Sequence, residues 1–298
     1  MGLPLVQPLE VRSALNRVRG MPFKWSLNPY RGCAHGCHYC FARSTHSYFE
    51  LDADGDFSSV LFAKVNLPEA LERDLSRRAW RRELVAIGTA TDPYQPLEGS
   101  YRLTRAALRL LARYRTPASI VTKGSMMVRD IDVLGELADV AGLTVCHSIP
   151  TVDEAIWRRT EPGTPPPRQR LRAMQRLREA GIRAGVLMAP LLPGLSAEPG
   201  AMAATARAAA EHGAAFISAI VLHLGPGVRE HFMAFLTREY PELAIDYGQL
   251  YVGKYAPRVY QNGIHTELRH LRRALGLGER EWNVRAPPPA PTQLSLGL

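Results

Sequence analysis

Residues 33–40 read CAHGCHYC and bring three thiols, those of Cys33, Cys37 and Cys40, into one short loop. The remaining cysteine, Cys146, stands far along the chain. A 4Fe–4S cube has four irons, and a cluster that serves only structure or electron transfer commonly gives each iron a thiolate. Three clustered thiols leave one iron free to bind another molecule. The C-x3-C-x2-C spacing therefore favours a cluster that does chemistry on a small molecule.

A zinc site and a disulfide framework fit these three cysteines less well than a cluster does. A zinc ion would require a fourth ligand, for which His35, His38 or a distant residue is available. Zinc sites are commonly built from two separated pairs of ligands, however, and no second pair is visible. A disulfide framework is disfavoured, because four cysteines in 298 residues are few and no secretory signal precedes them.

The composition describes a globular chain with ample material for a core, in one large domain or two small ones. Hydrophobic residues make up 46% and charged residues 22%, which excludes a disordered chain. No apolar run approaches the length of a membrane span, and residues 1–18 lack the layout of a signal peptide. We therefore expect a cytoplasmic protein without a membrane partner, in a reducing compartment that suits an oxygen-sensitive cluster.

The charge is strongly basic. Its net value is +9, from 37 Lys and Arg against 28 Asp and Glu, and arginine is much the commoner cation. Such an excess is typical of proteins with a polyanionic partner, nucleic acid above all. Solvated arginine-rich helix faces explain it equally simply, so a nucleic-acid partner stays open.

Short apolar runs alternate with amphipathic stretches, which is typical of repeated βα units around a parallel sheet. Several of the expected helices end at a glycine before the next strand. Strands are expected at 23–26, 84–88, 118–122, 143–148, 182–188 and 215–223, and helices at 67–79, 102–115, 128–141, 168–180 and 202–212. Such a series forms either a doubly wound sheet or an incomplete barrel. The cysteine loop follows the first strand, at the edge where active sites of parallel α/β folds collect.

The chain divides into four expected parts. Residues 1–20 form an N-terminal segment and residues 21–225 the α/β domain. Residues 226–280 are expected to form a helical extension, entered through the Gly-Pro-Gly turn at 225–227. The proline-rich residues 281–298 are expected to be an extended, disordered tail.

Three motifs in order carry a family resemblance: NPYRGC at 28–33 continuing to CFAR at 40–43, GTATDPYQP at 88–96, and VTK at 121–123. Together they resemble the spore photoproduct lyase-like branch of the radical S-adenosylmethionine (SAM) superfamily. The resemblance covers about residues 20–225. It implies a partial (βα)6 TIM-type barrel, a 4Fe–4S cluster on the three clustered cysteines, and SAM lying across the barrel top. It also implies an electron donor of the reductase, flavodoxin or ferredoxin type.

Residues at the ends of expected strands are the candidates for binding SAM. Thr89 and Thr91 offer hydroxyl or backbone groups and Asp92 a carboxylate, although an Asp-Pro turn explains this segment too. Lys123 provides a compact positive charge, which the resemblance assigns to the SAM carboxylate or ribose. Ser148 matches a family position that hydrogen-bonds SAM.

Further residues keep more than one interpretation. Arg159 and Glu161 match an Arg-x-Glu-Pro segment that positions SAM or substrate, or they form surface ion pairs. Cys146, on the same face of its strand as Ser148, is a core thiol, a fourth cluster ligand or a hydrogen-atom donor. The ring of Tyr39 suits packing over the cluster or adenine. His223, at the end of the sixth strand, faces the substrate or serves the structure.

Two departures separate this chain from spore photoproduct lyase proper. Phe41 lacks the hydroxyl of the tyrosines that pass a hydrogen atom there, and the stretch Thr89-Ala90-Thr91 lacks the hydrogen-donating cysteine. The sequence thus predicts a radical SAM enzyme that cleaves SAM to a 5′-deoxyadenosyl radical and abstracts hydrogen from an unidentified substrate; it assigns no catalytic residue. The alternative is a nucleic-acid-binding protein with a structural iron–sulfur or zinc site.

Overall fold

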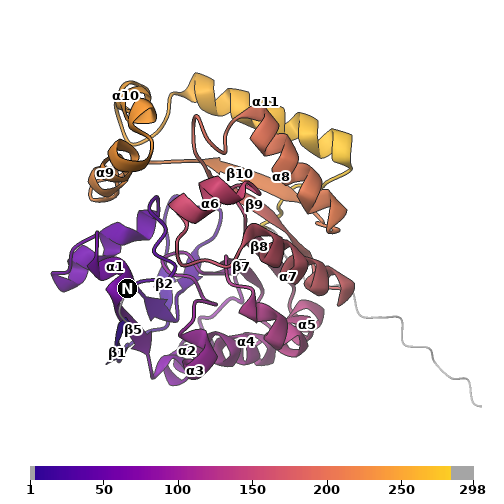
Figure 1. Ribbon diagram of the computed structural model, residues 1–298. Coiled ribbons are helices and arrows are strands. Elements are labelled where there is room, and N and C mark those ends of the chain that lie inside the picture. The colour runs from indigo at the N-terminus through magenta and orange to yellow at the C-terminus, as the bar shows by residue number, and fades with distance from the viewer. Residues whose placement is uncertain (1–3, 283–298) are drawn as a thin grey trace, which may run out of the picture.

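Six parallel strands lie side by side in the order in which the chain makes them (Figure 1). The computed structural model describes residues 4–282. The strands are β3 (Trp25–Leu27), β6 (Val85–Ile87), β7 (Ala118–Thr122), β8 (Leu143–Ser148), β9 (Ala184–Leu191) and β10 (Ile217–Val221). A doubly wound sheet reverses its strand order near the middle. This one does not, so the partial TIM-type barrel is confirmed.

Helices follow the strands and cover them. They are α2 (Leu67–Leu75), α4 (Leu103–Arg113), α5 (Ile131–Val140), α7 (Pro167–Glu179) and α8 (Pro199–Glu211). Each is amphipathic; α4, for example, buries Ala107, Leu108 and Leu111 at 3.6-residue spacing. These helices lie within a few residues of the expected ranges, because glycine and proline mark the ends of most of them.

Several short elements were not predicted. Strands β1 (Leu5–Leu9), β5 (Val60–Lys64) and β4 (Tyr30–Arg31) form a separate three-stranded sheet, and β2 (Leu15–Arg17) runs antiparallel to β3. The short helices are η1 (Phe41–Phe49), α1 (Asp56–Ser59), α3 (Glu98–Tyr101), η2 (Met126–Asp130) and α6 (Glu154–Thr160). Pro8 and the largely exposed side chains of β1 hide its strand character from a periodicity argument.

Three helices follow β10: α9 (Val228–Glu239), α10 (Pro241–Leu250) and α11 (Arg258–Leu275). The glycine turn expected before them is present, since Gly227 has a φ of 77° and directly precedes α9. Figure 1 shows α11 lying along α8, while α9 and α10 pair with each other.

The chain beyond α11 returns to the start of the barrel strands. Gly278 pairs with Phe216, and Arg280 donates to Ser119 Oγ at 3.0 Å. Of the tail expected at 281–298, residues 283–298 lie outside the described residues. None of the helices within residues 4–282 combines the length and the apolar character needed to cross a membrane.

Candidate functional site: a buried loop of three thiols

The three clustered thiols lie on the loop that follows β3 and β4. Cys33 and Cys37 are 6% and 5% exposed, and Cys40 is half-buried. Burial raises the pKa of Cys37 to about 12 and raises that of Cys33 well above its ordinary value. Neighbouring thiols add to both effects, so the three sulfur atoms interact electrostatically. Ionisation of all three thiols is thus unfavourable unless a cation binds to them.

The loop after β6 holds the start of the cysteine loop. Thr91 Oγ1 and Gln95 Nε2 donate to the carbonyl of Gly32 at 2.6 and 3.2 Å, and Ala34 N donates to Gln95 Oε1 at 2.9 Å. Gly32 has a φ of 69°, and a Cβ there would lie 2.9 Å from the carbonyl oxygen of Phe57. The residue before Cys33 must therefore be glycine.

The segment after α6 docks on the other side of the cysteine loop. His38 N donates to the carbonyl of Thr160, and Gly163 N donates to the carbonyl of His35, both at 3.0 Å. A Cβ at Gly163 would lie 2.4 Å from the carbonyl oxygen of Ala34. The segment at 159–162, which matches the Arg-x-Glu-Pro pattern, therefore packs against the thiol loop through backbone contacts.

Arg43 braces the same loop from inside. Its side chain is 2% exposed and donates to four carbonyls, those of Gly36, Cys37, Ala53 and Asp54, at 2.8–3.0 Å. Its guanidinium lies 5.1 Å from the ring centre of Phe57. Arg43 is part of the CFAR motif, for which the sequence predicted no separate role. In the structure its guanidinium holds the loop in place through these hydrogen bonds.

Glu161 is the centre of a buried ionic network. Its carboxylate accepts hydrogen bonds from Tyr39 and Arg170 and from the ammonium of Lys123 at 2.9 Å. Burial acts to raise its pKa, but Arg170 and Lys123 hold it at about 2. The surface ion pair considered for Glu161 is therefore wrong, whereas Arg159 is exposed and lies over the ring of Tyr240.

Lys123 and Ser148 lie together at the ends of β7 and β8. Lys123 Nζ donates to Ser148 Oγ at 2.8 Å, and Ser148 donates to the carbonyl of Ala189 at 2.9 Å. The ammonium lies 5.4 Å from the ring centre of Tyr39, and its charge acts to lower the pKa of Cys37. Two predicted cofactor ligands thus meet beside the thiol loop.

Asp92 joins the loops after β6 and β7. It accepts from Thr122 Oγ1 at 2.5 Å and from the backbone N of Lys123 at 2.6 Å, and it faces His35 at 3.4 Å. Burial opposes ionisation of Asp92, yet His35 and these donors hold its pKa at about 2.

Thr89, which was also predicted to bind SAM, accepts a hydrogen bond from Asn28 Nδ2 at 3.0 Å. The predicted residues thus share one strand edge, and Thr91 and Asp92 brace it.

A histidine pair links the thiol loop to the helical extension. His38 Nδ1 lies 3.0 Å from His231 Nε2, and His231 Nδ1 lies 2.6 Å from Asp54 Oδ1. His38 also stacks on Phe235 with ring centres 4.3 Å apart. Burial, then His231, lowers the pKa of His38 to about 4. Sequence reasoning missed His231, because nothing local marks a contact across so long a stretch of chain.

The other candidates lie apart from this loop or at its rim. Cys146 is fully buried against Leu187 and Phe216, in a group of contacts that contains none of the clustered cysteines. His223 lies near the rings of Phe41 and Tyr255, with ring centres 5.7 and 5.8 Å away. Cys146 is thus a core thiol in this structure, and His223 belongs to an aromatic rim.

The donor set fits a 4Fe–4S cluster. Thiols are the usual ligands of such clusters, and the three on this loop have no fourth described thiol beside them. Iron supplies the positive charge that three neighbouring thiolates require. The two histidines of the zinc alternative face Asp92 and His231 instead. Within residues 4–282, no group of three or more His, Cys, Asp or Glu side chains is arranged to hold a single metal ion.

Two uncharacterized proteins are similar to much of this chain. An uncharacterized protein of Mycobacterium tuberculosis is 39% identical over 264 residues, which cover 87% of this chain and 78% of that one. Another, of Methanocaldococcus jannaschii, is 27% identical over 188 residues, 63% of this chain and 68% of that one.

Solved structures of spore photoproduct lyase share the fold. The complex with dinucleoside spore photoproduct has a TM-score of 0.70 at 14% identity, and a variant with bound AdoMet and the same dinucleoside has 0.68 at 16%. Each match covers 91% of this chain and 79% of the lyase chain. The family model "Radical SAM superfamily" matches residues 27–206, and this chain belongs to the radical SAM superfamily.

Proposed function

We propose that this protein is a radical SAM enzyme in which Cys33, Cys37 and Cys40 hold a 4Fe–4S cluster with one iron open to SAM. The observation that carries the proposal is the isolation of the three thiols on one buried loop, with Cys146 packed elsewhere. When bound, the reduced cluster supplies the electron that cleaves SAM to a 5′-deoxyadenosyl radical, which abstracts a substrate hydrogen.

The side chains near the loop have distinct tasks in this proposal. Lys123 and Ser148 present an ammonium and a hydroxyl at the strand ends beside Tyr39, where they suit the polar groups of SAM. Thr89 adds a hydroxyl on the neighbouring strand end. Thr91 and Asp92 act through the loops that they hold, since their oxygens already bond to Gly32, Thr122 and Lys123.

The substrate reaction differs from that of the lyase. Phe41 is 49% exposed and carries no hydroxyl, and the loop after β6 carries no thiol. Cys146 is 0% exposed and so cannot meet a substrate without rearrangement. Hydrogen transfer through a protein thiol is therefore not part of the proposal, and the radical acts directly on the substrate.

Anaerobic reconstitution with iron and sulfide tests the proposal. We expect reduction by dithionite with SAM to yield 5′-deoxyadenosine, and SAM to alter the EPR signal of the reduced cluster. Cys33→Ala, Cys37→Ala and Cys40→Ala should each lose the cluster, whereas the matched control Cys146→Ala should keep it. Full cluster content and turnover in all three loop variants would refute the ligand assignment.

The electron donor and the alternative function are tested in the same preparation. We propose that a reduced flavodoxin or ferredoxin replaces dithionite and supports the same SAM cleavage. Absence of both SAM cleavage and an EPR response would favour the nucleic-acid-binding alternative. That alternative predicts binding to oligonucleotides that weakens steeply with salt.

A further inference from the structure

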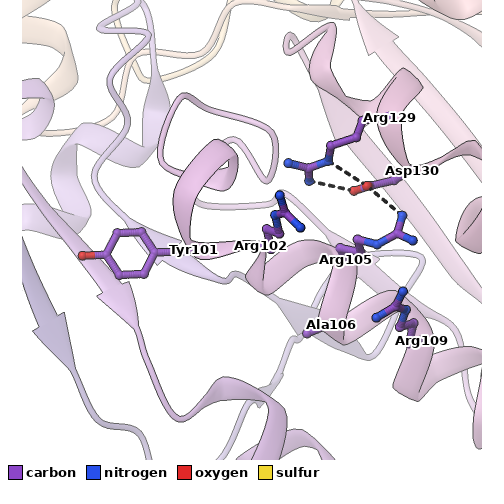
Figure 2. A pocket seen from close by; sticks show the side chains of 7 residues that line it. All are labelled: Tyr101, Arg102, Arg105, Ala106, Arg109, Arg129 and Asp130. Atoms are coloured by element: carbon purple, nitrogen blue, oxygen red, sulfur yellow. Dashed lines mark hydrogen bonds and ion pairs between the residues drawn. The ribbon is translucent and has the colours of Figure 1, made fainter.

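A basic hollow of about 560 Å3 opens between α4 and η2 (Figure 2). Its lining comes from α3, α4 and η2 and from Arg102, which lies between α3 and α4. The hollow is therefore separate from the thiol loop. Four of its seven lining residues are arginines and one is an acid. The lining is Tyr101, Arg102, Arg105, Ala106, Arg109, Arg129 and Asp130.

Two of the arginines are fixed by ion pairs. Asp130 is fully buried; it accepts from Arg105 Nη1 at 3.0 Å and from Arg129 Nε and Nη2 at 2.9 and 3.0 Å, as the dashed lines in Figure 2 show. Asp132 also pairs with Arg105, and Glu98 pairs with Arg129. These contacts hold both guanidinium groups in one orientation before any ligand arrives.

The other two arginines carry charge that no described carboxylate neutralises. Within residues 4–282, the side chains of Arg102 and Arg109 make no ion pair or side-chain hydrogen bond, and both are exposed. Arg109 stands four residues after Arg105 on the same helix, so both side chains lie on the side of α4 that lines the hollow. The charges of Arg102 and Arg109 are therefore open to an anion.

Side chains rather than backbone would hold that anion. The N–H groups of Thr104 and Arg105 at the start of α4 already donate to Glu98, at 2.9 and 3.1 Å. Arginine presents paired donors in a plane that matches phosphate oxygens, and such contacts are among the stronger hydrogen bonds in proteins. The hollow lies in the size range of small-molecule sites and is larger than a single phosphate requires.

We propose that this arginine pocket binds the phosphate groups of a ligand with at least two of them, carried on a small molecule or along a polynucleotide. Arg102 and Arg109 supply the donors and the neutralising charge, while Arg105 and Arg129, held by their carboxylate partners, form the fixed wall of the pocket. This binding activity is separate from the thiol loop and does not depend on SAM cleavage.

Calorimetric titration of the full reconstituted chain with inorganic pyrophosphate, at constant ionic strength, tests the proposal. We expect saturable binding that weakens about tenfold or more in Arg102→Gln/Arg109→Gln. The matched control is Arg172→Gln/Arg176→Gln, which likewise removes two exposed arginines from one region of the chain, here the helix α7. It lowers the net charge equally and should keep the affinity within about twofold of the parent. Thermal unfolding verifies that both variants are folded.

A labelled single-stranded oligonucleotide distinguishes the two sources of phosphate. Loss of oligonucleotide affinity in Arg102→Gln/Arg109→Gln, but not in the control pair, assigns the pocket to a polynucleotide backbone. Loss of pyrophosphate affinity alone assigns it to a small phosphorylated molecule. The proposal is overturned if the parent protein shows no saturable pyrophosphate binding, or if both arginine pairs lose affinity equally, since general positive charge would then suffice.

Discussion

The ammonium of Lys123 lies 2.9 Å from Oε1 of Glu161, and these side chains are only 12% and 3% exposed. The lysine expected at the cofactor site thus has a buried partner of its own. Glu161 also pairs with the fully buried Arg170, so one carboxylate balances two cations. The position of Lys123 therefore depends on a network that extends from β7 to α7.

Replacing Glu161 by Gln should destabilise the fold strongly. The substitution leaves the charges of Lys123 and Arg170 buried without an anion, and breaking a buried pair in this way costs about 3–5 kcal/mol. Urea unfolding of the protein without iron measures the change. Glu154→Gln, which breaks the exposed pair with Arg158, is the matched control and should cost less than about 1 kcal/mol. Equal small losses in the two variants would show that the network contributes little.

His147 should make the stability fall in mild acid. The ring is fully buried on β8, neither ring nitrogen has a hydrogen-bond partner among the described residues, and burial, then Arg170, lowers its pKa to about 3. The unfolded chain binds this proton near pH 6.5, so the contribution to stability is complete above that pH. It is lost as pH falls towards about 3, by up to about 1.4 kcal/mol per pH unit.

The variant His147→Leu removes that titration. Urea unfolding between pH 7 and pH 4 should therefore show a smaller loss of stability in the variant than in the parent protein. Identical pH slopes in the two proteins would mean that His147 is not held neutral in the folded state.

His231→Leu should loosen the thiol loop without unfolding the protein. It removes the partner of His38, and one such hydrogen bond contributes about 1 kcal/mol, equivalent to about fivefold in an equilibrium constant. The reconstituted variant should lose iron to a chelator about five times faster than the parent. His265→Leu, at an exposed position of α11, controls for loss of a histidine and should leave the rate unchanged. A variant with the parental rate would exclude a bracing role for the pair.

Gly163→Ala should impair both folding and iron incorporation. The added Cβ would lie 2.4 Å from the carbonyl oxygen of Ala34, so the docked segment or the thiol loop must move, at about 1–3 kcal/mol or more. Iron content after reconstitution and the midpoint of thermal unfolding both report it. Gly248→Ala has open space inside α10 and should stabilise by about 0.5–1 kcal/mol. Parental iron content in Gly163→Ala would show that the two segments separate without consequence.

Local pattern predicted the regular part of the barrel well. Strands β7 and β8 begin and end at the expected residues, because their apolar runs lie between a helix stop and a polar loop. Strand β9 instead runs from Ala184 to Leu191, later than expected. The small sheet of β1, β5 and β4 was missed, since its pairing joins residues far apart in sequence, β1 is largely exposed and β4 has only two residues.

The sequence alone determined the three thiols, their spacing, and the series of strands and helices that places them at a sheet edge, because each depends on neighbouring residues. Tertiary structure decided the barrel order of the strands, the burial of Glu161 between Lys123 and Arg170, and the contact of His38 with His231. It also decided which arginines are neutralised and which surround an open hollow. These features depend on distances between groups remote in sequence, which only the packing of the whole chain sets.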